Sequence, residues 1–356
     1  MENKVLMKGT DALAEAAIQA GCRCYFGYPI TPQNELPEYM ARRMAEVGGV
    51  FLQGESEIAS INMVLGAAAS GVRAMTSSSS PGISLKQEGI SFLAAMELPA
   101  LIVNIMRGGP GLGNIAPNQG DYYQATRGGG HGDYRTPVFA PASIQELYDI
   151  TMYAFDVADI YRTPVMILGD GMMGQIVEPT ICRKRQKIDL PPKDYILDGA
   201  KGRPSRIIRS LILDTFEMEE HNWKLKRKYD LMRGKLPQHE EFMVADAKLV
   251  IVAYGTAARI AKGAVKRARK EGLSVGLLRP ITLWPFPTQA IQDIAKKVKH
   301  FLVFEMSTGQ MVDDVLLALG GKADCEFYGR PGGVVPTPME ITRIIGRYWV
   351  QKEISG

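Results

Sequence analysis

The sequence has few cysteines and no close cluster of them. Its four cysteines are Cys22, Cys24, Cys182 and Cys325, and only the first two lie near each other. Iron–sulfur clusters usually need several cysteines at short, regular spacing. The spacing therefore predicts that this chain carries no iron–sulfur cluster and that any redox cluster belongs to another polypeptide. At the start of a predicted strand, Cys22 and Cys24 are expected to be small, partly buried residues.

Long apolar runs and a strong excess of one charge are also missing. The longest apolar runs, such as 100–103 and 301–304, have strand length, whereas a membrane span needs about 18 or more residues. The first nine residues show no cationic head followed by an apolar core, so no secretory signal is predicted. The 42 basic and 38 acidic residues are interspersed, which does not indicate nucleic-acid binding. We expect a globular, cytoplasmic protein that binds neither membranes nor nucleic acids.

A repeated strand-and-helix pattern occupies both ends of the chain. With 356 residues, 46% of them apolar, the chain is long enough for two domains with full cores. The pattern weakens between them, where two prolines and a charged helical segment around 217–233 occur. We predict an α/β fold with a parallel-sheet domain over 1–190, a linker with a charged helix over 191–245, and a smaller α/β domain over 246–356.

A strand that ends in a proline-rich corner stands near the start of the first domain. The corner reads Tyr-Pro-Ile-Thr-Pro over residues 28–32. Pro29 and Pro32 fix their own φ angles and push the preceding residues toward extended geometry, which restricts Ile30 and Thr31. We expect Thr31 to be exposed at the carboxyl end of a strand, where α/β sheets bind ligands. A plain strand-to-helix turn is the alternative.

Three other predicted strands end in polar residues. Glu57 follows strand 50–53 at the start of a helix, where a carboxylate can simply interact with the helix dipole. Four serines, Ser77 to Ser80, follow the next strand, and hydroxyls and amides at a helix start suit an anion or a polar ring substituent. Arg107 ends the most apolar strand as a fixed cation. The glycine-rich stretch 108–134 that follows has little periodicity, and such loops are usually functional or mobile.

Four segments in this order and spacing resemble one known family over nearly the whole chain. Together they resemble the alpha subunit of 2-oxoacid:ferredoxin oxidoreductases, and within that family they are most similar to the subunit for 3-methyl-2-oxobutanoate (2-oxoisovalerate). The segments are Gly-Tyr-Pro-Ile-Thr-Pro (27–32), Glu-Ser-Glu-Ile-Ala-Ser (55–60), Arg-Gly-Gly-Pro (107–110) and Arg-Pro-Ile-Thr-Leu-Trp-Pro-Phe-Pro (279–287). The resemblance implies a thiamine diphosphate pyrimidine-binding domain followed by a transketolase C-terminal-like domain.

The resemblance also assigns roles to single residues. Glu57 matches the glutamate that bonds N1′ of the thiamine aminopyrimidine, where proton exchange activates the cofactor; Glu55 is the rival position. Thr31 and Arg107 match residues that hold the carboxylate and carbonyl of the substrate, a role that suits a planar guanidinium. Further cofactor contacts are implied at four positions, namely Pro29, Ile30, Ser79 and Ser80.

The Mg²⁺–diphosphate half of such a site is expected on another chain. Gly169-Asp-Gly171 resembles the opening of the thiamine diphosphate metal motif, but that motif needs an asparagine further along, and residues 190–202 contain none. We interpret Gly169-Asp-Gly171 as a turn after a strand. The implied partners are a beta subunit with the Mg²⁺ and diphosphate site, a gamma subunit and a ferredoxin-like iron–sulfur subunit.

The implied reaction is oxidative decarboxylation of a 2-oxoacid with coenzyme A to acyl-CoA, CO₂ and reduced ferredoxin. Leu112 and Ile115 offer apolar surface, and no lysine lies between Lys86 and Lys184 to meet a second carboxylate. Branched-chain 2-oxoacids are therefore favoured, although Arg127 could swing in as a counter-charge. The alternatives are 2-oxoglutarate or pyruvate as substrate, transketolase-like transfer without ferredoxin, and a non-catalytic scaffold subunit.

Overall fold

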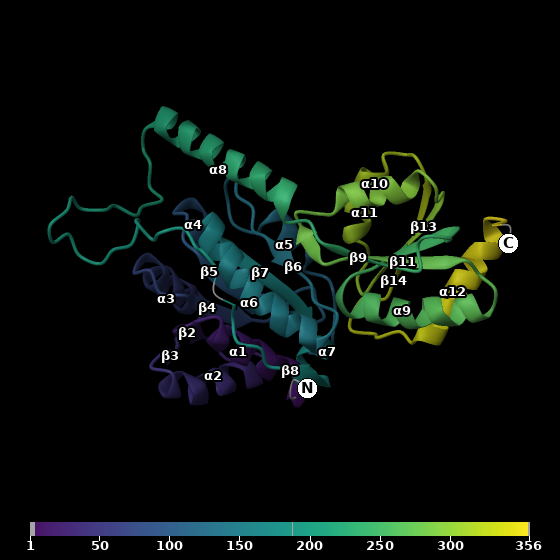
Figure 1. Ribbon diagram of the computed structural model, residues 1–356, viewed down its shortest axis with the longest axis horizontal. Helices are drawn as coiled ribbons and strands as arrows, with labels where there is room; N and C mark the ends of the chain where they lie inside the picture. The colour runs from purple at the N-terminus through teal and green to yellow at the C-terminus, as the bar shows by residue number, and fades with distance from the viewer. Residues whose placement is uncertain (1–3, 187, 355–356) are drawn as a thin grey trace.

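The computed structural model describes residues 4–186 and 188–354. Within these residues the chain forms a seven-stranded, a five-stranded and a two-stranded sheet. The two larger sheets lie toward opposite ends of the molecule, and the long helix α8 runs along one side of the first (Figure 1). The predicted α/β class is confirmed.

The first sheet has the strand order β12-β6-β7-β5-β4-β2-β3, and its neighbouring strands are parallel except at the β12–β6 edge. Its central strand, β5, is buried along its whole length, as a near-continuous apolar run predicts for a parallel strand covered on both faces. The strands are β2 (Cys24–Gly27), β3 (Val50–Gln53), β4 (Ala74–Ser78), β5 (Ala100–Met106), β6 (Val138–Phe139), β7 (Pro164–Asp170) and β12 (Thr282–Trp284).

Helices that follow these strands cover the sheet. Helix α1 packs against α2 and α6, while α3 packs against α4. The small residues of α3 and the alanines of α1 allow these close contacts. The helices are α1 (Gly9–Gln19), α2 (Glu35–Glu46), α3 (Glu57–Ala69), α4 (Ser80–Ala95), α5 (Tyr122–Arg127), α6 (Ile144–Tyr161) and α7 (Gly171–Gln175).

The second sheet has the order β14-β13-β10-β11-β9, with only the β9 edge antiparallel. Strand β10 is buried throughout, and α9 and α12 pack against each other beside the sheet. The strands are β9 (His239–Phe242), β10 (Leu249–Val252), β11 (Val275–Pro280), β13 (His300–Glu305) and β14 (Asp324–Gly329). The helices are α9 (Gly255–Lys270), α10 (Thr288–Ala295), α11 (Met311–Leu319) and α12 (Pro338–Gln351).

The two parts are interlocked. Strand β12 belongs to the C-terminal half of the chain but extends the first sheet by pairing with β6. The buried side chain of Gln119 donates to the Tyr254 carbonyl at 3.0 Å and accepts from the Met306 amide at 2.9 Å. These contacts fix the stretch after Arg107 against the second sheet. The domain limits 1–190, 191–245 and 246–356 remain our proposal.

Two short strands and one helix were not predicted from the sequence patterns: one strand near the end of the predicted first domain, one in the predicted linker, and a helix in the aperiodic stretch. Strand β8 (Val177–Ile181) pairs antiparallel with β1 (Lys4–Lys8), and β9 falls within the predicted linker. Helix α5 lies inside the stretch predicted to be aperiodic. These elements are short and partly exposed, so they carry little apolar periodicity. The charged helix is confirmed as α8 (Thr215–Lys235), of which only Leu225, Tyr229 and Met232 are buried.

Gly169-Asp-Gly171 is not a simple turn, which corrects the prediction. Asp170 ends β7 and caps α7, because its carboxylate accepts from the amides of Met172 at 3.0 Å and Met173 at 3.1 Å. It also accepts from the Thr256 hydroxyl at 2.9 Å. Asp170 thereby joins the two halves of the chain.

No helix in the described part of the chain combines the length and the apolar character that crossing a bilayer requires.

Candidate functional site

The carboxyl ends of four adjacent parallel strands bring the predicted site residues to one edge of the first sheet. Strand β2 leads into the corner with Thr31, β3 leads to Glu57, β4 leads to the serine run, and β5 leads to Arg107. The order β5-β4-β2-β3 places these strand ends side by side. Residues that are far apart in the sequence are therefore neighbours here, as expected for an α/β sheet.

Arg107 is held against the corner. Its Nη1 donates to the Thr31 carbonyl and its Nη2 to the Leu112 carbonyl, both at 3.0 Å. Neither bond neutralises the guanidinium, because both acceptors are backbone carbonyls. The side chain is buried, and its Nε has no hydrogen-bond partner among the described residues. Arg107 is thus a fixed cation that has capacity left for an anion.

The corner itself is supported from the core. The Tyr25 hydroxyl and Ser77 Oγ are 2.7 Å apart, and Ser77 Oγ donates to Gln33 Oε1 at 2.5 Å. All three side chains are buried. This chain of bonds links β2, β4 and the residue after Pro32, so the corner is rigid while Thr31 stays exposed, as predicted. Of the other predicted corner contacts, Pro29 is exposed and Ile30 is half-buried.

Glu57 is the first residue of α3 and lies against the first turn of α4. Ser56 caps α3 by accepting from the Ala59 amide at 3.1 Å. A Cβ atom placed on Gly82 would lie 2.6 Å from Glu57 Oε1, so the glycine lets the carboxylate approach the α4 backbone. Glu57 is only 7% exposed, whereas Glu55 is exposed. The burial favours Glu57, the position preferred from the sequence, over its rival Glu55.

Lys86 is a site residue that the sequence patterns did not indicate. It lies one turn beyond Gly82 on α4, is fully buried, and donates from Nζ to the Glu57 backbone carbonyl at 3.3 Å. Burial lowers the pKa of Lys86 to about 8, and the charge of Glu57 opposes this effect. The available signal was its position between Ile83 and Ile90 on the apolar face of a helix, where a lysine is rare.

Replacing Lys86 with methionine should raise stability by about 1 to 2 kcal/mol at pH 7, because it removes a buried charge at the cost of one hydrogen bond. The pKa is about 8 in the folded chain and 10.5 ordinarily. Between these values the folded wild type has lost a proton that the unfolded chain keeps, so wild-type stability rises with pH. The advantage of Lys86→Met should therefore shrink in denaturant unfolding at pH 9.5. A variant less stable than wild type at both pH values would contradict this account.

The four serines divide into two kinds. Ser77 supports the corner, and Ser80 Oγ accepts from the Arg107 amide at 3.0 Å and donates to Asp121 at 2.5 Å. The hydroxyls of Ser78 and Ser79 are buried and have no hydrogen-bond partner in the described parts of the chain. Ser79 caps α4 without using its side chain. Two buried hydroxyls at the start of α4 are therefore available to a polar ligand, and that of Ser78 lies close to Gly82 and the Glu57 carboxylate.

The stretch after Arg107 is tied down at several points. Burial raises the pKa of Asp121, whose carboxylate accepts from Ser80 and from Asn104 Nδ2 at 2.9 Å. Arg127 forms a bidentate ion pair with Asp314, in which Nη1 donates to Oδ2 at 3.0 Å and Nη2 donates to Oδ1 at 2.9 Å. The idea that Arg127 could swing toward a substrate is therefore not favoured, because that motion would break this pair. Leu112 and Ile115 are exposed.

Comparison with known proteins places this geometry in a family. Residues 15–231 match the family described as "Pyruvate flavodoxin/ferredoxin oxidoreductase, thiamine diP-bdg", and residues 247–341 match "Pyruvate:ferredoxin oxidoreductase core domain II". The chain is 49% identical to ketoisovalerate oxidoreductase subunit VorB of Methanothermobacter marburgensis, over 99% of this chain and 98% of that one. It is 37% identical to 2-oxoglutarate synthase subunit KorA of Methanothermobacter thermautotrophicus, over 97% and 99%.

A solved structure has the same fold. It is 2-oxoglutarate:ferredoxin oxidoreductase from Magnetococcus marinus with 2-oxoglutarate, coenzyme A and succinyl-CoA bound, with a TM-score of 0.87 and 25% identity. The match covers 97% of this chain but only 65% of that longer one. The matched families cover both halves of the chain, and the relatives that match over nearly its full length are themselves named as subunits. The chain therefore belongs to the thiamine diphosphate-binding 2-oxoacid:ferredoxin oxidoreductases, as one subunit of a multi-subunit enzyme.

Proposed function

We propose that this chain supplies the aminopyrimidine half of a thiamine diphosphate site in a branched-chain 2-oxoacid:ferredoxin oxidoreductase. The observation that carries the proposal is the buried carboxylate of Glu57, held against Gly82 at the same sheet edge as Arg107 and Thr31. The residues present fit the cofactor. The buried hydroxyls of Ser78 and Ser79, which have no hydrogen-bond partner among the described residues, offer bonds to a polar ring, and that of Ser78 lies close to the carboxylate.

Each residue of this chain has a separate task in the proposal. Bound thiamine diphosphate supplies the electron sink for decarboxylation of the 2-oxoacid. Glu57 holds and exchanges a proton at N1′ of the ring, a task that needs a carboxylic acid whose position is fixed. Arg107 orients the carboxylate of the substrate, since its guanidinium is positioned by Thr31 and Leu112 but not neutralised.

The diphosphate and Mg²⁺ are assigned to a beta subunit. The aspartate of Gly169-Asp-Gly171 is already used, because Asp170 caps α7 and bonds Thr256. Exposed apolar side chains stand beside the site, with Ile58 next to Glu57 and Leu85 next to Lys86. Apolar residues exposed around a half-site are typical of a surface that a partner covers.

Electron transfer is assigned to other polypeptides. The four cysteines are unpaired and dispersed, and burial raises the pKa of Cys22 to about 12, so this thiol is a poor metal ligand. We therefore place the iron–sulfur clusters on a ferredoxin-like subunit, beside a gamma subunit, with ferredoxin as acceptor and coenzyme A as the acyl acceptor. Free thiols are consistent with the cytoplasm as location.

A branched-chain substrate fits this chain better than a dicarboxylate. Burying the distal carboxylate of 2-oxoglutarate requires a counter-charge, and the ion pair with Asp314 restrains Arg127. The exposed side chains of Leu112 and Ile115 present apolar surface on the stretch that follows Arg107, and the guanidinium bonds the Leu112 carbonyl. The relative that is 49% identical is named for ketoisovalerate, and the one at 37% for 2-oxoglutarate.

Turnover of the co-expressed complex tests this function. With coenzyme A and a low-potential electron acceptor, kcat/KM for 2-oxoisovalerate should exceed that for 2-oxoglutarate by roughly 10-fold to 200-fold, as expected for a matched apolar group worth about 1 to 3 kcal/mol. Pyruvate should fall below 2-oxoisovalerate as well. An equal or higher value for 2-oxoglutarate would show that the apolar-pocket interpretation is wrong, and Arg127→Ala would then be the next variant to measure.

A further inference from the structure

Helix α8 contacts the rest of the chain through one of its faces. It runs along one side of the first sheet (Figure 1), and its buried side chains are Leu225, Tyr229 and Met232. Lys228, beside Tyr229, donates from Nζ to Glu97 Oε1 at 3.1 Å. The orientation of α8 on the body is therefore fixed, and so is the face that points away from the body.

The opposite face of α8 carries large apolar side chains. Phe216, Trp223 and Leu231 are 80%, 56% and 59% exposed. At about 100° of rotation per residue, all three lie nearly opposite the buried side chains of the helix. Single exposed apolar residues are normal on a protein surface, whereas an apolar line along one face is the feature by which a helix packs against another element. The described part of the chain leaves this second apolar face open.

Two charges of opposite sign lie on the same face of α8. Glu220 and Arg227 are exposed and have no ion-pair partner among the described residues, whereas Lys224 between them pairs with Glu97. Both lie outside the first and last turns of α8, so the helix dipole does not explain their signs. We call the apolar and charged residues of this face the outer stripe, which consists of Phe216, Glu220, Trp223, Arg227 and Leu231.

We propose that the outer stripe packs antiparallel on the outer stripe of a second copy of this chain, with the two-fold axis directly after Trp223. In this register Glu220 of each copy lies opposite Arg227 of the other. Phe216 lies opposite Leu231, and the two Trp223 rings meet beside the axis. A two-fold interface requires this kind of reciprocal contact, in which the same patch on both copies is self-complementary.

The spacing of the charges favours a second copy over an unrelated subunit. Glu220 lies four residues after Phe216. Arg227 lies four residues before Leu231, so the register that pairs the charges also pairs the apolar side chains. Laying the stripe on itself does not guarantee this agreement, because a shift of four residues in either direction sets Glu220 opposite an apolar residue, Leu231 or Trp223. Charged pairs of this kind set the partner and the orientation of packed helices.

A contact between two single helices is small. The outer stripe spans about 22 Å of helix, and such a pair buries less than the roughly 1,200–2,000 Å² of a standard interface. The association that α8 provides is therefore weak on its own. Covalent cross-linking is the suitable measurement, because it captures a weak contact.

Cross-linking of cysteine variants in the co-expressed complex tests the register. With helix axes about 8–10 Å apart, the two Lys224 Cα atoms should lie roughly 6–8 Å from each other. Lys224→Cys, in a Cys182→Ser background because Cys182 is exposed, should therefore give a dimer of this chain with a short bismaleimide. Glu97 keeps its ion pair with Lys228 in this variant. Lys235→Cys is the matched control on the same helix, since the two Lys235 positions would be roughly 35 Å apart.

Charge reversal distinguishes a second copy from another partner. In the Lys224→Cys background, Glu220→Arg sets arginines of the two copies against each other and should slow cross-linking about tenfold. Arg227→Glu should have the same effect by opposing two glutamates. The double variant with Glu220→Arg and Arg227→Glu restores opposite charges at both positions, so its cross-linking should return to nearly the starting rate. A partner with a different sequence would not give this restoration.

Four results would overturn the proposal. They are the absence of a cross-link at Lys224→Cys, a cross-link to a different polypeptide, equally fast cross-linking of Lys235→Cys, and a double variant that stays as slow as the single ones. Both reversed residues are exposed and unpaired in the described part of the chain, so the fold should tolerate every variant.

Discussion

Replacing Glu57 with glutamine should lower kcat of the assembled complex by a factor on the order of 10² or more while leaving fold and assembly intact. Glutamine keeps the shape and can still bond N1′, but it cannot exchange the proton. The carboxylate is buried against Gly82, so solvent does not readily replace it. The measurement is steady-state turnover of 2-oxoisovalerate with circular dichroism and gel filtration as fold controls.

Glu55→Gln is the matched control for this experiment. Glu55 is exposed two residues earlier, and its variant should turn over at nearly the wild-type rate. If the Glu57 carboxylate did no more than interact favourably with the dipole of α3, removing its charge would lower stability by about 0.3–1 kcal/mol and leave kcat unchanged. Normal turnover of Glu57→Gln, with a loss in Glu55→Gln, would transfer the role to Glu55.

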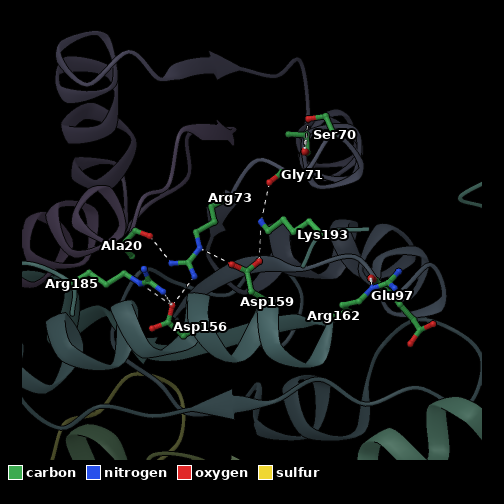
Figure 2. A network of polar contacts seen from close by, with 11 residues as sticks. Ala20, Ser70, Gly71, Arg73, Glu97, Asp156, Asp159, Arg162, Arg185 and Lys193 are labelled. Atoms are coloured by element: carbon green, nitrogen blue, oxygen red, sulfur yellow. Dashed lines mark hydrogen bonds and ion pairs between the residues drawn. The ribbon is translucent and has the colours of Figure 1, made fainter. Parts of the chain in front are cut away.

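Replacing Arg73 with alanine should destabilise the chain by about 3 kcal/mol, the low end for breaking a buried ion pair. Arg73, just before β4, bonds two aspartates of α6, Asp156 at 2.6 Å and Asp159 at 2.8 Å, and the Ala20 carbonyl at the end of α1 at 2.6 Å (Figure 2). The cost stays at the low end because Arg185 and Lys193 still neutralise the two aspartates. The guanidinium also lies over the Phe155 ring.

Thermal unfolding measures this loss, with an expected decrease in midpoint of roughly 4 °C for a chain of 356 residues. Arg267→Ala is the control, because Arg267 is an exposed arginine on α9 whose removal should change stability by no more than about 0.5 kcal/mol. A midpoint for Arg73→Ala within 1 °C of the control would show that the ion pairs contribute nothing.

Much of the fold could be predicted because buried parallel strands read as continuous apolar runs. Strand β5 and helix α8 have the predicted type and nearly the predicted ends. Short elements such as β1, β8 and α5 carry too few residues for periodicity to show. The pairing of β12 with β6 is a contact over a long sequence distance, which no local pattern reports.

The candidate site was predictable in part for the same reason. Thr31, Glu57 and Arg107 follow strands, and parallel strand ends meet at one edge. Lys86 lies on α4, past its first turn, and its side chain bonds the Glu57 carbonyl at the start of α3. Its role therefore depends on the packing of α3 against α4, which no local sequence pattern reports. The division of the serines into bonded and unpartnered hydroxyls likewise depends on Gln33 and Asp121, which are distant in sequence.

The most direct test of the central claim, a half-site completed by another subunit, is calorimetric titration of thiamine diphosphate with Mg²⁺. The titration is performed on this chain alone, on its beta subunit alone and on the two together. We predict tight, stoichiometric binding only to the two together, since in our proposal this chain contributes Glu57 and the buried hydroxyls of Ser78 and Ser79, while the beta subunit contributes the diphosphate site. Stoichiometric, Mg²⁺-dependent binding to this chain alone would contradict the account.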